Sequence, residues 1–141
     1  MSKLSAKEYL MQIEKLDTII KNKLIELSQW KDIALGVTAR SDGERVQASG
    51  RPSKMADAMD RFVDIEKDIN GLVDRFVDLK REVTKTIEQL PTTEYDVMHK
   101  RYIQYMTFDE IAAAKDRSKS SVTTIHGRAL VNLQRILDQG Q

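Results

Sequence analysis

Cysteine is absent from this chain of 141 residues, and proline and aromatic residues are scarce. Without cysteine there is neither a disulfide framework nor a thiolate metal site. Two prolines and 6% aromatic residues, beside 32% charged residues, favour a mostly helical protein. The length allows one compact domain, or a small domain with an extended helical part.

Long apolar runs and an excess of one charge are also missing. No run approaches the roughly 18 residues of a membrane span, and charges interrupt the first residues, so we expect no membrane contact and no signal peptide. These features are compatible with the cytoplasm, which is the location we expect. The formal net charge is only +1, so charge alone does not indicate a nucleic-acid partner.

Histidine is equally rare, because His99 and His126 are the only two. They are far apart in the sequence, and no constellation of acidic residues accompanies either one. A catalytic or metal site needs several such groups that converge. We therefore expect no enzymatic activity, no metal and no cofactor.

Apolar residues recur at steps of three or four between residues 5 and 35, which predicts an amphipathic helix. Its predicted buried face consists of Leu10, Ile13, Leu16, Ile20, Leu24 and Leu27, followed by Trp30. Residues 36–52 are rich in Gly, Ser and Arg and show no such period. They predict a long, mobile loop.

Residues 53–89 carry the strongest pattern, a seven-residue repeat that predicts a coiled-coil seam. The seam consists of Met55, Ala58, Phe62, Ile65, Ile69, Leu72, Phe76, Leu79 and Val83. It keeps its phase through Asn70-Gly71, so we predict one helix there and not a turn. Leu90-Pro91 ends this helix, because proline lacks the backbone donor.

Further apolar residues widen the seam to an arc of about 160° on a helical wheel. They are Met59, Val63, Val73, Val77 and Ile87. Such an arc is broader than one partner helix covers, so we expect a homo-oligomer. The residues predicted at the shared surface are Phe62, Ile65, Ile69, Leu72, Phe76 and Leu79.

A further helix is expected after Pro91, with Thr92 or Thr93 as its N-cap. Its predicted buried side consists of Val97, Met98, Tyr102 and Tyr105. Thr107 and Glu110 then have the spacing of a capping box, and Met106 and Ile111 that of a hydrophobic staple. We therefore predict a short helix from Phe108 to about Asp116.

Ser118 is the predicted N-cap of a last helix that starts at Lys119. Only about three residues separate it from the preceding helix, which forces the sharp crossing of a helix-turn-helix. Val122 and Ile125 should point to the core, so short polar side chains face outward. The start of such a helix suits phosphates and base edges. The candidate DNA-binding residues are Lys115, Arg117, Ser118, Lys119, Ser120, Ser121, Thr123, Thr124 and Arg128.

The segment MTFDEIAAAKDRSKSSVTTIHGRALVNL resembles region 4 of bacterial sigma factors. The matching positions are Glu110-Ile111, Ser118, Val122, Ile125, Ala129-Leu130 and Leu133, and the resemblance covers residues 92–137. It implies a domain that binds double-stranded DNA, with RNA polymerase as a second candidate partner. Asp116 stands where the family usually has glycine, but Asp tolerates the left-handed conformation better than most residues.

The helical N-terminal half followed by this segment resembles the phage-encoded ArpU- and RinA-like late transcription regulators of Gram-positive hosts. That resemblance implies a sequence-specific transcription regulator from a phage or prophage. We thus predict an all-α fold, with a helical hairpin or coiled coil over residues 1–90 and a helix-turn-helix domain over 91–141. Two alternatives remain: a phage DNA-packaging protein of the small terminase type, and a structural or adaptor coiled coil that does not bind DNA.

Overall fold

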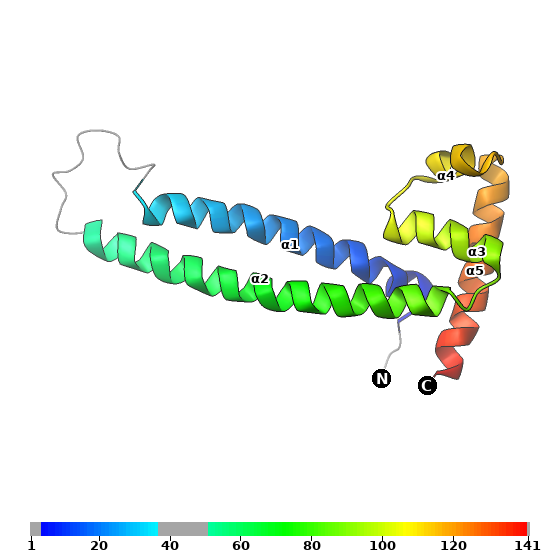
Figure 1. The fold of residues 1–141 in the computed structure, drawn as a ribbon, viewed down its shortest axis with the longest axis horizontal. Coiled ribbons are helices and arrows are strands. Elements are labelled where there is room, and N and C mark those ends of the chain that lie inside the picture. Colours follow the sequence, from blue (N-terminus) through cyan, green and yellow to red (C-terminus); the bar gives the residue numbers. More distant parts are fainter. Residues whose placement is uncertain (1–3, 37–50, 141) are drawn as a thin grey trace. The chain divides into compact units, whose positions relative to one another are not determined.

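The computed structural model describes residues 4–36 and 51–140, and the regular secondary structure of these residues is entirely helical. In chain order the elements are α1 (Ala6–Ala34), α2 (Arg51–Ile87), α3 (Thr92–Met98), the π-helix η2 (His99–Ile103), α4 (Phe108–Lys115) and α5 (Lys119–Gln139) (Figure 1). The predicted all-α fold is confirmed. Within the described ranges, no helix has the length and apolar character to cross a membrane.

The two long helices lie where the sequence pattern predicted them. α2 passes through Gly71 without a break, as the unbroken phase of the seam indicated. Most of the loop predicted at 36–52 lies outside the described residues, and its last two positions belong to α2.

The seam of α2 is buried in the predicted phase. Ala58, Ile65, Ile69 and Val83 are buried, whereas Met55 at its start is exposed. Of the residues predicted at a surface shared between copies, Ile65 and Ile69 are thus already covered within one chain, and Phe62, Leu72, Phe76 and Leu79 are half-buried. The apolar residues that remain exposed lie on one flank of the seam: Met59, Val63, Val73 and Val77.

The buried face of α1 differs from the prediction at one position. Leu10, Ile13, Leu16 and Ile20 are buried as expected, but Leu24 is 48% exposed. Lys23, which lies seven residues after Leu16, is half-buried instead of Leu24. Packing with a seven-residue repeat selects position 23, and the aliphatic stem of a lysine can cover apolar surface there.

The described chain divides into two compact units, one of residues 17–75 and one of residues 4–16 with 76–140. In the first, segments of α1 and α2 lie side by side, and the Arg61 guanidinium is 5.8 Å from the ring centroid of Trp30 (Figure 1). The second unit holds the helix-turn-helix, and we call it the head unit. The predicted domain boundary at residue 90 remains a prediction.

One apolar cluster joins the ends of the long helices to α5 within the head unit. Leu10 and Ile13 of α1, Ile87 of α2 and Leu133 of α5 are fully buried in it. Beside the cluster, the Tyr9 hydroxyl donates to Glu82 Oε2 at 2.9 Å, and burial raises the pKa of Tyr9 to about 12. The start of α1 is therefore part of the core that supports the helix-turn-helix.

The N-cap of α3 differs from the predicted one. Neither Thr92 nor Thr93 is the N-cap residue; Pro91 is, with extended ψ of 150° and no side-chain hydrogen bond at this end. Proline cannot donate, but its fixed φ suits the entry to a helix. The helix therefore starts one or two residues earlier than predicted, and both threonines lie in its first turn.

Tyr105, which was predicted to be buried, is exposed in the structure. After α3 the backbone widens into η2, where the Gln104 N–H bonds to the His99 carbonyl five residues back. Tyr105 follows with a φ of 60° and is 37% exposed, whereas Tyr102 is buried. Tyr105 lies two residues beyond the end of η2, so helical spacing no longer relates its direction to that of Tyr102.

Candidate nucleic-acid interface

α4 starts with the capping box that the sequence predicted. The Glu110 N–H donates to Thr107 Oγ1 at 3.1 Å, and the Thr107 N–H donates to Glu110 Oε1 at 2.8 Å. Ile111 is fully buried and Met106 packs against the same cluster, as a hydrophobic staple requires. These local bonds determine where α4 begins and how the chain enters it.

The turn after α4 depends on one residue in the left-handed region. Asp116 has φ 54° and ψ 51°, and its N–H bonds to the Ala113 carbonyl at 3.3 Å. The Arg117 N–H bonds to the Ala112 carbonyl at 2.9 Å. This pair of bonds forms a Schellman motif, which usually has glycine at the left-handed position. Asp116 takes that position in this chain.

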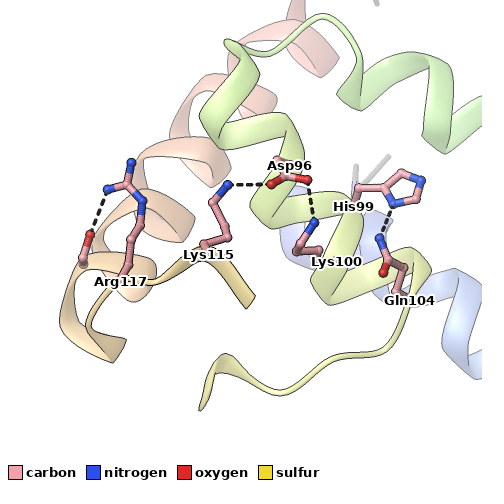
Figure 2. A network of polar contacts seen from close by, with 7 residues as sticks. Asp96, His99, Lys100, Gln104, Lys115 and Arg117 are labelled. Carbon is pink, nitrogen blue, oxygen red and sulfur yellow. Dashed lines mark hydrogen bonds and ion pairs between the residues drawn. The ribbon is translucent and has the colours of Figure 1, made fainter. Parts of the chain in front are cut away.

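α5 starts two residues after this turn, at Lys119, as predicted. The Ser121 N–H donates to the side chain of the N-cap residue, Ser118, at 3.0 Å. Arg117 Nη1 donates to Ser121 Oγ at 3.3 Å, which places the guanidinium beside the first turn of α5 (Figure 2). The remaining backbone N–H groups of this first turn have no partner within the helix.

A small apolar cluster holds α4 and α5 in the crossing. Val97, Ile111 and Val122 are fully buried, and Ala112 and Ile125 are nearly so. The predicted phase of α5 is thereby confirmed, with Val122 and Ile125 turned to the core. The opposite face of α5 is directed to solvent.

The outward face of α5 carries short side chains. Ser120, Thr123, Thr124 and Arg128 are exposed, and so is Lys119 at the tip. At Gly127, apart from its chain neighbours and the backbone of α5 itself, no heavy atom lies within 4 Å of where a Cβ would be. No long side chain covers the centre of this face, so the edge of a DNA groove could come close to the backbone of α5.

Two of the predicted contact lysines have carboxylate partners. Lys115 is only 17% exposed and pairs with Asp96 of α3, which also binds Lys100 at 2.9 Å (Figure 2). Hydrogen bonds from Lys115 first, and from Lys100 second, lower the pKa of the Asp96 carboxyl. Lys119 lies 3.7 Å from Asp109, with both side chains well exposed. Lys115 thus ties the end of α4 to α3, whereas Lys119 remains at the surface.

Asp96 and Asp109 were not among the predicted site residues. The four-residue step from Asp96 to Lys100 is visible in the sequence and typical of a helical ion pair. The pairing with Lys115 is not, because it depends on how α3 and α4 pack.

His126 joins α5 to the elements before it. Its Nε2 is 2.7 Å from the Tyr102 hydroxyl, and its ring meets the Phe108 ring edge-on at 5.0 Å. The Arg101 guanidinium of η2 lies over the Phe108 ring, 4.4 Å from its centroid, and Arg101 Nη1 donates to the Met106 carbonyl. Burial, followed by the charge of Arg101, lowers the pKa of His126 to about 4. His126 is therefore a neutral packing residue at pH 7.

Comparison with known families agrees with this geometry. Residues 86–135 match the family model of Sigma-70, region 4. These residues form a helix-turn-helix of the sigma region 4 type. The match covers about a third of the chain, from the end of α2 to most of α5, and supports DNA binding by this part. No curated protein and no solved structure matches the chain.

Proposed function

We propose that this protein is a sequence-specific DNA-binding regulator of transcription, with α5 as its recognition helix. The observation that carries the proposal is the match of residues 86–135 to sigma region 4. The polar, open face of α5 supports it, because that face begins at a capped helix N-terminus, where the first N–H groups have no partner within a helix. A DNA-binding protein of this kind would act in the cytoplasm, where bacterial and phage DNA lie.

The contacts follow from where the side chains lie. Lys119, Ser120, Thr123 and Thr124 would enter the major groove, with Ser118 and Ser121 at its edge. Arg117 and Arg128 would lie near phosphates. Lys115 would reach a phosphate only by leaving Asp96, so we assign it to the support of the turn.

A second copy of the chain is part of the proposal. Few cations lie on the outward face of α5, and two linked units would bind two half-sites far more tightly than one. The exposed flank of α2, with Met59, Val63 and Val73, is an apolar surface that such a copy could cover.

The biological setting rests on resemblance alone. Origin in a phage or prophage, control of late genes and contact with RNA polymerase come from the likeness to the ArpU- and RinA-like regulators. A sigma region 4-type domain makes RNA polymerase the second candidate partner after DNA.

The test of the proposal is binding of the full chain to duplexes selected from a random pool, measured by fluorescence anisotropy over a range of salt concentrations. Lys119→Ala with Arg128→Ala should weaken binding. It should also flatten the plot of log affinity against log salt by about one to two units, since each lost phosphate contact changes the slope by about 0.9 and Arg128 is expected near a phosphate.

The matched control is Arg81→Ala with Lys85→Ala, which removes two exposed cations from α2. This control should leave affinity and slope nearly unchanged. If the Lys119 and Arg128 double variant binds as tightly as the control, with the same slope, the outward face of α5 is not the DNA surface.

A further inference from the structure

Two threonine hydroxyls on the outward face of α5 are turned back onto the helix itself. Thr123 Oγ1 donates to the Ser120 carbonyl at 3.0 Å, and Thr124 Oγ1 donates to the same oxygen at 2.9 Å. Both side chains are exposed. Because the hydroxyl protons are used within the helix, each threonine can offer a groove only its methyl group and the lone pairs of its oxygen.

The residues around these two threonines leave them as the side chains placed to contact bases at the centre of the outward face of α5. Ser120 and Gly127 lie one turn before and one turn after them and are short. The long donors at this end, Arg117 and Lys119, lie at the tip of α5, where they contact Ser121 and Asp109, and not at the centre of the face. The central surface of α5 is therefore poor in donors and carries two methyl groups.

The major-groove edges of the base pairs differ in what they require. Guanine presents two acceptors, N7 and O6, and so needs a donor from the protein. Thymine presents its C5-methyl group, and adenine presents an N6 amino donor. Cytosine also presents an amino donor, N4, so acceptor oxygens suit adenine and cytosine alike. The methyl groups are what favour thymine, and hence A·T pairs.

We propose that Thr123 and Thr124 recognise A·T pairs in the major groove through contact of their methyl groups with the C5-methyl groups of thymine. This inference rests on the proposed function, and it names the class of base that α5 selects. Threonine methyl against thymine methyl is an apolar contact of the kind that discriminates bases at the groove floor.

The test removes the methyl group from each side of the contact in turn. The full chain is used to select duplexes from a random pool, and each thymine of the selected site is then replaced by deoxyuridine, which lacks only the C5-methyl. At one or two thymines the affinity should fall roughly fourfold, the effect expected for exposing about one methyl group.

The protein side uses two substitutions at each threonine. Thr124→Ser and Thr123→Ser keep the hydroxyl and lose the methyl, so they should weaken binding by a similar factor and make the deoxyuridine change silent at the contacted base. Thr124→Val and Thr123→Val keep the methyl and lose the hydroxyl, so they should still distinguish thymine from deoxyuridine. Circular dichroism of each variant shows whether α5 is retained.

The inference and the proposed function fail in different ways. If every deoxyuridine substitution is silent for the unmodified chain, while the chain still selects and binds its duplex, the methyl contact is wrong and DNA binding stands. The same holds if the serine variants remain as sensitive to deoxyuridine as the unmodified chain. If the chain binds no duplex and selects no sequence, the proposed function is itself wrong.

Discussion

His126 is the residue of the head unit whose ionisation should matter most for stability. Its pKa in the folded chain is about 4, below the ordinary value of 6.5, because burial disfavours the charged form. The unfolded chain therefore binds the proton more readily, and protonation favours unfolding. The stabilising effect of a neutral His126 is complete above pH 6.5 and is lost as the pH falls toward 4.

We therefore expect the melting temperature to drop between pH 7.5 and pH 5 more for the unmodified chain than for His126→Gln. Glutamine can still hydrogen-bond to Tyr102 but does not titrate. The other groups with lowered pKa values, Asp96 and His99, are present in both proteins, so the difference isolates His126. Equal drops in the two proteins would show that His126 titrates normally.

Asp116 should be a position where a single substitution stabilises the turn. A residue with a Cβ is strained at φ 54°, and glycine is not. Asp116→Gly should raise the free energy of unfolding by about 0.5–1 kcal/mol, since the relieved strain exceeds the entropic cost of glycine.

The control for this change is glycine at a helical position nearby. Ala113 is exposed within α4, and Ala113→Gly should lower the free energy of unfolding by about 1 kcal/mol. Urea unfolding measures both. If the two glycine variants change stability in the same direction, the left-handed conformation of Asp116 carries no strain.

At the scale of the elements, α1 should contribute to the head unit through its first turns. Leu10 is fully buried in the same apolar cluster as Leu133 of α5, whereas Leu24 is 48% exposed. Leu10→Ala should lower the free energy of unfolding by about 2–5 kcal/mol, because it leaves a cavity in a packed core.

Leu24→Ala makes the same chemical change in the same helix and should alter stability by less than about 0.5 kcal/mol. Chemical unfolding monitored by circular dichroism compares the two. Similar losses would mean that the cluster around Leu10 is not the core that supports α5.

At the scale of the whole molecule, the exposed flank of α2 predicts self-association. Light scattering at micromolar concentration should give about twice the chain mass of 16.2 kDa, or a higher multiple. A mass of many chains would favour the DNA-packaging alternative, because small terminases assemble into rings. A stable monomer of one chain mass would show that the flank needs no partner copy.

Val63→Lys with Val73→Lys should return the mass to that of one chain without loss of helix, since both side chains are exposed. Ile69 would be a poor choice for this test, because it is buried within the single chain and a lysine there would destabilise the fold. The control, Asp64→Lys with Asp74→Lys, places lysines one residue further along α2, also at exposed positions. It should leave the mass unchanged.

The features that the sequence determined by itself are those set by groups a few residues apart. The seven-residue repeat predicted α2 through Gly71, and the spacing of Thr107 and Glu110 predicted the capping box at the start of α4. Ser118 as N-cap and the inward direction of Val122 were likewise visible from local spacing. Hydrogen bonds at helix ends and helical periodicity involve short stretches of chain, so the pattern of residues was sufficient.

Only the tertiary structure decided which of these elements share a core. Leu10 and Leu133 are buried together although more than a hundred residues separate them, and Asp96 pairs with Lys115 across two helices. The end of the helix at Ile103, which leaves Tyr105 outside it and exposed, also has no local signal. The free energy of burial and of ion pairing depends on which surfaces meet in space. A periodic pattern predicts that one face of a helix will be buried. Which surface packs against that face depends on the packing of the whole chain.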